Sequence, residues 1–483
     1  VNAVPEDIMG MYPPRRLREG AVVARFAPSP TGMLHIGGLY AALVSERLAH
    51  QSGGIFYLRI EDTDKKREVK HSIPDIIDSM AYFGIRFDEG VTGVDAETGS
   101  YGPYRQSARA FIYKVFVKCL IEKDLAYPCF CTEEELESLR KEQEEVGARP
   151  GYYGKWALHR HFSPDQIDRE TAMGRKYVIR LKSPGSVKKR LVLNDLIKGD
   201  VILPENDQDI VILKSDGLPT YHFAHVIDDF LMGTTHVIRG DEWLSSVPLH
   251  LQLFELLGFR KPHYGHISSI LKKEGNSKRK LSKRKDLDAT AGYYRKLGYP
   301  GQAVTEYFLN LINSDYEKWR TDNPNEPYSG FVINPAKMSV SGALFDINKL
   351  DDIGKNVIAS FSAEQVYNDT LSWAETYDRE LFELMKIYPE YTLNILNIER
   401  VSDKPGKNFA KWADIKPNIG YFYDELFNKM PEGSCSLPVV KSLADAQHII
   451  GSYMDIYNPS DKKPVWFETV SYTHLTLPTN REV

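Results

Sequence analysis

Apolar positions of two different periods divide the first part of the chain into strands and helices. Short apolar runs predict strands at 21–26 and 54–60, and helical apolar spacing predicts helices at 39–50 and 73–83. A Pro-Ser-Pro-Thr-Gly loop ends the first strand. This order is typical of a doubly wound α/β sheet, whose ligands bind beyond the carboxyl ends of the strands. The loop after the first strand is therefore the first candidate site.

The pattern changes between residues 113 and 217. A stretch rich in Glu and Arg predicts a helix at 133–145, a Gly/Tyr turn follows at 150–154, and short alternating runs predict strands at 177–182 and 209–214. We interpret this part as an α/β insertion into the sheet.

Strand and helix patterns like those of the first part of the chain return after residue 218. Amphipathic helical spacing dominates beyond about residue 345, for example at 382–396 and 410–415. The predicted parts are a leader or disordered segment at 1–20, a first half-sheet at 21–112, the insertion at 113–217, a second half-sheet at 218–288, a connecting region at 289–345, a helical region at 346–470 and a tail at 471–483. The tail does not continue the preceding pattern; it resembles translated adapter sequence, and the alternative interpretation is a frayed end.

Composition narrows the class of protein. With 42% hydrophobic and 26% charged residues in 483, the chain has ordinary globular values. No run approaches the roughly 18 apolar residues of a membrane-spanning helix, so we expect no membrane association. Four cysteines are too few and too unevenly spaced for a disulfide framework, which favours a reducing compartment. The net charge of −5 argues against indiscriminate binding to nucleic acid, although the run from Lys272 to Lys285 is strongly basic.

The first motif that carries chemistry begins in the first predicted strand, as Arg25-Phe-Ala-Pro-Ser-Pro-Thr-Gly, and ends in His35-Ile-Gly37-Gly38. Glycines at a helix start let a phosphate chain approach the backbone, where unpaired N–H groups and the helix dipole favour an anion. His35 can donate a hydrogen bond to such phosphates. An isolated His-x-Gly-Gly is a weak signal, and the preceding eight residues make the match specific.

The second motif, Lys280-Leu-Ser-Lys283-Arg284, lies inside the basic run after the second half-sheet. Two lysines three residues apart can flank a triphosphate. Ammonium groups that approach the triphosphate only as the reaction proceeds stabilise the charge that develops in the transition state. A solvated basic loop is the alternative reading of the run by itself, and the first motif argues against it.

Together these motifs resemble the two signatures of the class I aminoacyl-tRNA synthetases. Within that class the chain resembles the glutamyl-tRNA synthetases of the bacterial or mitochondrial type, over about residues 22–345. Further motifs of that family occur in order: RIEDTD from Arg59, GPYRQS from Gly102, LPTYHFA from Leu218, DDFLMG from Asp228 and HVIRGDEW from His236.

The resemblance implies a set of site residues. Catalysis would involve His35, Lys280 and Lys283. The glutamate site would contain Arg25, Ala27, Ser29, Glu61, Tyr221, His225 and Arg239. The ATP site would contain His35, Gly37, Gly38, Glu242, Trp243, Lys280, Leu281, Ser282, Lys283 and Arg284. These residue types suit a dicarboxylic amino acid, because arginines bind its side chain and a carboxylate binds its ammonium group.

Two positions depart from the family pattern. His225 stands where relatives often carry a small polar or aliphatic residue, so its contact with glutamate is open, and its protonation could tune affinity. Cys129 and Cys131 match the first half of a zinc site of some relatives, but Trp156 and Leu158 fall where its second half is expected. His159 and His161 could substitute in a shifted register. Because structural zinc takes four ligands, we do not expect zinc to be bound.

The implied reaction is ATP-dependent ligation of L-glutamate to tRNA for glutamate through a glutamyl adenylate, with magnesium accompanying ATP and tRNA bound before activation. The implied fold is a Rossmann-type catalytic domain with an acceptor-stem-binding insertion, followed by an all-α anticodon-binding region. Charging of tRNA for glutamine stays open. We expect a monomer, and the leader favours the mitochondrial matrix over a bacterial cytoplasm.

Three rival functions are less well supported. Glutaminyl-tRNA synthetases carry a DDTNP-type sequence where this chain has EDTDKK, and their carboxyl-terminal part is rich in strands. A catalytically inactive RNA-binding paralogue would be expected to lose His35, Lys283 or Arg25, and all three are present. A shortened relative that glutamylates a tRNA base would lack the helical region.

Overall fold

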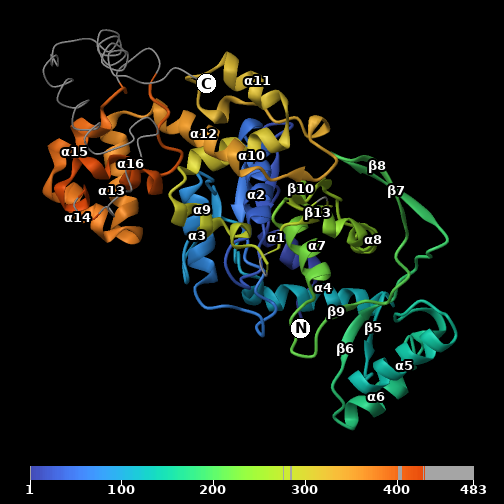
Figure 1. Ribbon diagram of the computed structural model, residues 1–483. Helices are drawn as coiled ribbons and strands as arrows, with labels where there is room; N and C mark the ends of the chain where they lie inside the picture. Colours follow the sequence, from blue (N-terminus) through green and yellow to red (C-terminus); the bar gives the residue numbers. More distant parts are fainter. Residues whose placement is uncertain (1, 276, 283–284, 401–404, 428, 430–483) are drawn as a thin grey trace, which may run out of the picture. The chain divides into compact units, whose positions relative to one another are not determined.

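The computed structural model describes residues 2–275, 277–282, 285–400, 405–427 and 429 (Figure 1). The chain forms two compact units, residues 1–415 and 416–483. Lys283, Arg284, the tail at 471–483 and most of the last third of the predicted helical region at 346–470 lie outside the described residues.

A parallel sheet in two halves forms the centre of the first unit. In the first half β1 pairs in parallel with β2, β2 pairs in parallel with β3, and β4 closes the edge in the antiparallel sense. In the second half β10 pairs in parallel with β11. These strands are β1 (Val23–Phe26), β2 (Ile55–Leu58), β3 (Glu89–Val91), β4 (Glu97–Thr98), β10 (His236–Gly240) and β11 (His263–Ile267).

Strand β1 lies between the two halves. On one side Val23 pairs with Ile55 of β2. On the other side Val23 accepts a hydrogen bond from the amide N of Thr235 over 2.9 Å, and its own N–H donates to Thr235 Oγ1 over 2.9 Å. The chain therefore leaves β1 at the point where the two halves of a doubly wound sheet meet, and the crevice beyond its carboxyl end is where such folds bind ligands.

Helix α2 (Ile36–Gln51) covers the sheet at this junction and packs on β1, β2 and β10. Ile36, Leu39 and Leu43 of α2 are almost fully buried. The observed β1, β2, α2 and α3 (Ser72–Tyr82) agree with the predicted elements to within a few residues at each end.

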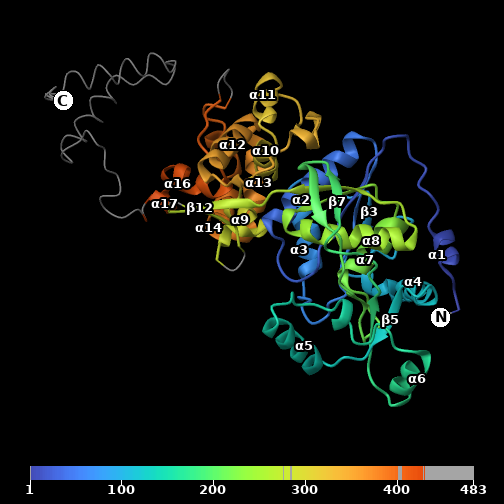
Figure 2. The ribbon, with the colours of Figure 1, turned by 90° about the vertical axis from the view of Figure 1, so that its right-hand side faces the viewer.

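The amino-terminal segment differs from the expectation of a disordered leader. Residues Pro5–Met11 form helix α1, and Figure 2 shows it beside α4 (Ala110–Glu122). Ile8 is buried, and both Nη atoms of Arg15 donate to the carboxylate of Glu89 over 2.8 Å. The segment has too few apolar residues to show a period, but Ile8 and Tyr12 are buried in the main core cluster.

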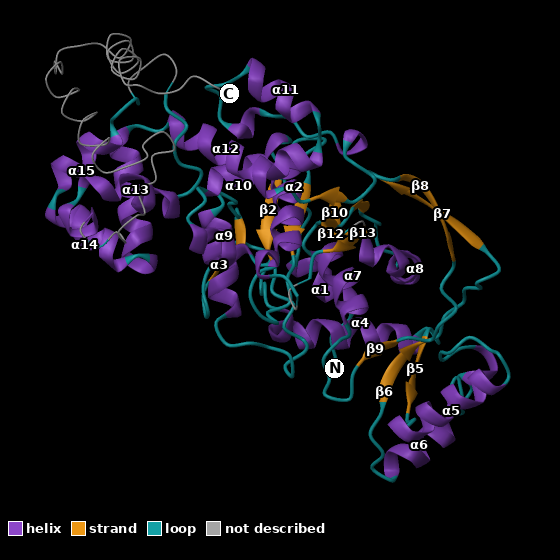
Figure 3. Ribbon diagram, viewed as in Figure 1, coloured by secondary structure: helices purple, strands orange, loops and turns teal. Residues whose placement is uncertain are grey.

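The insertion begins later than the predicted boundary at 113. Helix α4 belongs to the catalytic core, since Val115, Phe116 and Leu120 are buried in the main cluster. The remaining insertion elements are β5 (Ala126–Cys129), α5 (Glu133–Glu145), α6 (Pro164–Ala172), β6 (Val178–Leu181), β7 (Arg190–Asp195), β8 (Gly199–Pro204) and β9 (Val211–Leu213). Strands β5, β6 and β9 form one antiparallel sheet, beside α5 and α6 in Figure 3, and β7 and β8 form a hairpin.

Residues after the insertion rebuild the catalytic domain and continue into helices. The elements are α7 (Tyr221–Leu231), α8 (Val247–Leu257), the sheet β12 (Ile270–Glu274), β13 (Ser277–Lys280) and β14 (Ala343–Leu344), then α9 (Ala291–Leu297), α10 (Gly301–Ile312), α11 (Asp315–Asp322), α12 (Ile347–Ser360), α13 (Ala363–Tyr377), α14 (Arg379–Ile387) and α15 (Pro389–Leu396). None of the helices among the described residues is long and apolar enough to cross a membrane.

Two helical predictions need correction. The apolar period at 382–396 continues through Tyr388, but Pro389 lacks a backbone N–H and starts a new helix there, so the segment forms α14 and α15. Residues 410–415 form a short 3₁₀ turn at Trp412–Asp414, and the next helix begins only at Ile415. In the second unit the structure describes 416–427 and 429, with α16 (Ile415–Ile419) beginning at the boundary and α17 (Asp424–Phe427) beyond it.

Candidate functional site

A cavity of about 440 Å³ lies beyond the carboxyl ends of β1 and β10. Most of the residues that the sequence assigns to the glutamate and ATP sites line it: Arg25, Ala27, Ser29, His35, Gly37, Gly38, Glu61, Tyr221, Arg239, Glu242, Trp243, Lys280 and Leu281. Ser282 and His225 are described but do not line the cavity. The volume is in the range of small-molecule sites.

His35 occupies the amino-terminal cap of α2. Its Nδ1 accepts a hydrogen bond from the backbone N–H of Gly37 over 2.9 Å, which places the proton of the neutral imidazole on Nε2. A Cβ at Gly37 would lie 3.1 Å from His35 Nδ1, so glycine gives the cap its room. The positive dipole end of α2 thus faces the same cavity as the imidazole.

Arg25, Arg59 and Asp229 form a buried charge cluster at the base of the cavity. Arg59 Nη1 donates to Asp229 Oδ1 over 2.6 Å, and Arg25 Nε lies 3.5 Å from Asp229 Oδ2. Asp229 thus neutralises part of the charge of two arginines. The sequence assigned no role to Arg59 or Asp229, although both lie in the quoted motifs.

Glu61 faces the cavity from the end of the same cluster. Its Oε1 accepts from Arg59 Nη2 over 3.1 Å, and the side chain is 5% exposed. Burial raises the pKa of Glu61 to about 7, while the positive charges of Arg59 and Arg25 work in the opposite direction. A carboxyl group in this position can ionise to bind a cation at slightly alkaline pH.

Arg239 is the second arginine of the cavity, and its partners differ from those of Arg25. Its Nε donates to His266 Nε2 over 3.1 Å, its Nη1 to His250 Nδ1 over 3.3 Å, and its Nη2 to the carbonyl of Trp243 over 3.3 Å. In the described part of the chain no carboxylate oxygen lies within 4.0 Å of this guanidinium. Neutral acceptors therefore hold Arg239 and leave its charge for an anionic ligand.

His225 lies behind the cavity wall. Its ring is fully buried and stacks on Tyr221 with centroids 5.9 Å apart, and its Nε2 lies 3.0 Å from the hydroxyl of Tyr264. Burial lowers the pKa of His225 to about 4, although Asp229 opposes the shift. Burial thus favours the neutral form of His225, whose ring lies against Tyr221 and has its Nδ1 2.9 Å from Asp229 Oδ2.

The second motif approaches the cavity from the hairpin of β12 and β13. Lys280 ends β13, is exposed, and its Nζ lies 3.1 Å from Glu242 Oε2. Leu281 is buried in the cavity wall, and the backbone N–H of Ser282 donates to Asp286 Oδ2 over 3.0 Å. Asp286 also accepts two bonds from Arg279, so the loop is anchored next to its lysines.

Sequence reasoning missed Ser268, Ser269 and Ile270, which also line the cavity. They follow directly after β11, at the carboxyl end of a parallel strand. Ser269 Oγ donates to Asp241 Oδ1 over 3.0 Å. Their position at the carboxyl end of a strand of the second half-sheet is the signal that could have identified them.

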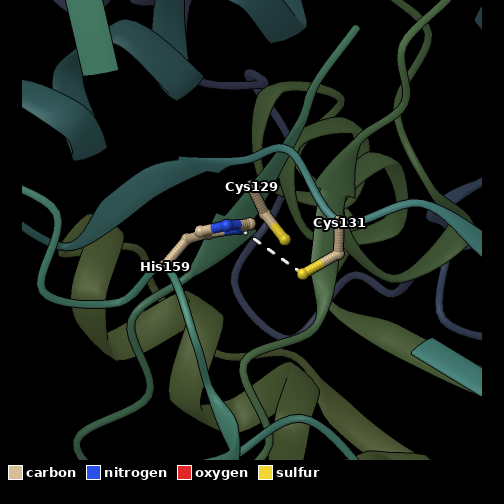
Figure 4. A group of neighbouring side chains, drawn as sticks. All are labelled: Cys129, Cys131 and His159. Carbon is tan, nitrogen blue, oxygen red and sulfur yellow. Dashed lines mark hydrogen bonds between the residues drawn. The ribbon is translucent and has the colours of Figure 1, made fainter. Parts of the chain in front are cut away.

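A separate group of possible metal ligands lies on the insertion. Cys129, Cys131 and His159 bring their ligand atoms within 4.8 Å of one another, and Cys131 Sγ lies 3.4 Å from His159 Nδ1 (Figure 4). The hydroxyl of Tyr152 lies 3.4 Å from Cys129 Sγ and 3.5 Å from Cys131 Sγ. His161 is exposed and outside this group. Three such ligands fit zinc in kind, one short of the four of a structural site.

Comparison with known proteins places the site in a family. Residues 21–351 match the model of tRNA synthetases class I (E and Q), catalytic domain. The glutamate–tRNA ligase of Clostridium perfringens is 53% identical over 477 residues, which are 99% of this chain and 87% of the relative. That of Acetivibrio thermocellus is 45% identical over 468 residues, or 96% and 84% of the two chains. Both relatives are bacterial, which gives no support to the expected mitochondrial location.

A solved structure agrees with these sequences. The crystal structure of a glutamate tRNA ligase from Elizabethkingia meningosepticum, in complex with its amino acid, superposes with a TM-score of 0.74 at 30% identity, covering 94% of this chain and 89% of that chain. The predicted Rossmann-type fold with helices after it is thereby confirmed. The chain belongs to the class I tRNA synthetases for glutamate and glutamine, and within them to the glutamate–tRNA ligases.

Proposed function

We propose that the chain ligates L-glutamate to tRNA for glutamate in two steps. A carboxylate oxygen of glutamate attacks the α-phosphorus of ATP and pyrophosphate leaves, which gives glutamyl adenylate. A hydroxyl of the terminal tRNA ribose then attacks the activated carbonyl, loses its proton and releases AMP. The observation that carries the proposal is one cavity with Arg25, Arg239 and Glu61 in its wall, at the start of α2.

The amino-acid end of the cavity suits a dicarboxylate. Arg25 and Arg239 supply positive charge for the side-chain carboxylate, and Glu61 supplies negative charge for the ammonium group. Glutamine has a neutral amide in place of that carboxylate, so it would leave the guanidinium of Arg239 without an anion in a buried site. Leaving a buried charge unpaired costs several kcal/mol, which favours glutamate.

The other end of the cavity suits ATP. The positive dipole end of α2 attracts phosphate, Trp243 offers a ring for the base, and the exposed Lys280 lines the cavity. The proton on His35 Nε2 can donate to a phosphate oxygen as charge develops on the leaving pyrophosphate. Lys283 and Arg284, outside the described residues, continue the same basic loop. These groups position the reactants and neutralise charge, and the enzyme forms no covalent bond to the substrate.

Cofactors and partners follow from the reaction. We propose that magnesium enters with ATP, whose phosphates it binds, and that zinc takes no part, because the cysteine group lies on the insertion and contributes nothing to the cavity wall. The insertion and the carboxyl-terminal helices are proposed to hold the acceptor stem and the anticodon of tRNA. With bacterial relatives, the proposed location is a bacterial cytoplasm.

The glutaminyl activity is the remaining alternative within the family, since the matching family model covers both amino acids. The charge of Arg239 argues against it. An inactive paralogue is disfavoured because the cavity retains Arg25, His35 and Lys280.

ATP–pyrophosphate exchange tests the proposal, with glutamate or glutamine, each with and without tRNA for glutamate. We expect exchange that requires glutamate and tRNA and falls at least tenfold in Lys280→Ala, where a transition-state cation is lost. Lys118→Ala, a partly exposed lysine of α4 that lies outside the cavity wall, is the matched control and should keep full exchange. Exchange with glutamine alone would transfer the proposal to the glutaminyl activity, and no exchange would favour the inactive paralogue.

A further inference from the structure

Two residues behind Arg239, His266 and Asp195, determine how its guanidinium is held. Arg239 and His266 are register partners on the parallel strands β10 and β11, and Arg239 Nε donates to His266 Nε2 over 3.1 Å. An imidazole nitrogen accepts a hydrogen bond only when it carries no proton. This contact therefore requires a neutral His266 with its proton on Nδ1.

Asp195 selects that tautomer from the other side of the ring. His266 Nδ1 lies 2.6 Å from Asp195 Oδ2, and both side chains are buried. Asp195 ends β7 of the insertion, so the group that sets the ring belongs to a different part of the chain from β10 and β11. The carboxylate accepts the Nδ1 proton, which leaves Nε2 as an acceptor for Arg239.

The two carboxylate oxygens of Asp195, Oδ1 and Oδ2, cannot exchange roles. Asp195 Oδ1 accepts from the backbone N–H groups of Ile197 over 3.0 Å, Lys198 over 2.9 Å and His266 over 3.2 Å. Three donors converge on this oxygen, so only an acceptor can occupy its position. The orientation of the carboxylate, and of anything isosteric with it, is set by the backbone.

We propose that Asp195 and His266 are positioning residues for glutamate binding: they hold the guanidinium of Arg239 through a neutral acceptor, so that its charge stays available to the substrate. A carboxylate in direct contact would fix Arg239 equally well but would compete with the substrate for its charge. Arg25, which lies 3.5 Å from Asp229, is in that situation. The second imidazole on Arg239, His250, is of the same kind: its Nδ1 accepts from Nη1, and its Nε2 lies 2.9 Å from His222 Nδ1.

Asp195→Asn tests the inference, which rests on the proposed function. The amide oxygen must take the place of Oδ1, because the three backbone donors exclude the NH₂ group there. The NH₂ group then faces His266 Nδ1 and forces the ring proton onto Nε2, where it opposes Arg239 Nε–H. We expect the KM for glutamate to rise roughly 10- to 100-fold, the effect of losing a hydrogen bond to a charged group, with the KM for ATP changed less than about twofold.

Three further variants separate positioning from folding. Asp200→Asn, the same chemical change at an exposed site of β8, should leave both KM values unchanged. His266→Gln keeps an acceptor oxygen within reach of Arg239 and should retain a KM for glutamate near that of the wild type, whereas His266→Leu should behave like Asp195→Asn. Thermal unfolding of each variant shows whether it is folded.

The outcomes distinguish a failure of the proposed function from a failure of the positioning role. A wild-type chain without glutamate-dependent exchange would overturn the proposed function itself. An active wild type whose Asp195→Asn variant keeps its KM for glutamate, or loses kcat equally with all substrates, would overturn the positioning role alone. Equal losses in His266→Gln and His266→Leu would do the same, because an acceptor would then make no difference.

Discussion

The guanidinium of Arg59 and the carboxylate of Asp229 lie in contact behind the cavity, with Nη1 2.6 Å from Oδ1 and both side chains fully buried. Arg59 is on the segment after β2 and Asp229 is in α7, so the pair joins the two halves of the sheet. Arg109 and Asp228 form a second such pair over 2.7 Å. A buried charge that has lost its partner is much more costly than a solvated one.

Asp229→Asn is therefore expected to destabilise the chain by roughly 3–5 kcal/mol, since it leaves Arg59 without its main counter-charge in a site closed to water. Urea unfolding followed by circular dichroism measures the change. Asp352→Asn is the matched control: its carboxylate is 69% exposed and 3.7 Å from Lys355, so its loss should cost less than about 1 kcal/mol. Equal effects of the two substitutions would contradict the assigned role of the buried pair.

Arg25→Gln should weaken glutamate binding without harming the ATP end of the cavity. The amide keeps a hydrogen-bond donor but removes the charge, so we expect kcat/KM for glutamate to fall roughly 10- to 1000-fold, in the range of a truncated buried charge pair. Steady-state exchange kinetics with varied glutamate and then varied ATP give both constants. A rise in the KM for ATP of the same size would show that Arg25 supports the whole cavity and does not bind the amino acid.

The buried Glu61 should make both stability and glutamate binding depend on pH. Burial raises the pKa of Glu61 to about 7 from 4.5. Because the folded-state pKa is the higher one, the protonated form stabilises the fold below about pH 4.5, and this contribution is lost as the pH rises through about 7. Binding has the opposite requirement, since only the ionised carboxylate attracts the substrate ammonium group.

We therefore expect the KM for glutamate to fall as the pH rises from 6 to 8, with a slope of up to about tenfold per unit below the pKa and a plateau above it. In Glu61→Gln the KM should be high and nearly independent of pH. Exchange assays at constant ionic strength measure both profiles. An unchanged slope in the variant would assign the titration to another group.

The cysteine group makes a prediction about metal. Cys129, Cys131 and His159 supply three donors, and a structural zinc site takes four. We expect dialysis against a chelator to remove any zinc and to shift the Tm by less than about 2 °C, well below the effect of a structural site. Stoichiometric zinc that survives dialysis would instead identify a fourth ligand. Tyr152→Phe would then test the hydroxyl that lies beside both sulfurs.

Local pattern was sufficient for much of the first half-sheet. The predicted helix at 39–50 became α2, and the predicted strands at 21–26 and 54–60 became β1 and β2, because each has an apolar face of the right period. The helix at 133–145 matches α5 because Thr132 and Glu135 form a capping box that the sequence shows directly. The cavity residues were found for a similar reason, since short motifs at strand ends carry them.

Other features depend on residues far apart in the chain. Ile8 and Arg15 show no period: Ile8 is buried in the main core cluster, and Arg15 pairs with the distant Glu89. His225 was assigned to the glutamate site by its place in a motif, but the turn of α7 points it toward Asp229 and Tyr264. His159 joins the two cysteines only through the folding of the insertion.

The sequence by itself determined the class of fold, the family and many of the side chains that line the cavity, because these follow from local periods and from motifs of contiguous residues. Only the tertiary structure decided which charges in the cavity are already neutralised. Arg25 and Arg239 are alike in sequence, each at the end of a strand, yet one lies against Asp229 and the other against His250 and His266. Electrostatic interactions act through space, so the chain order of the residues does not contain this difference.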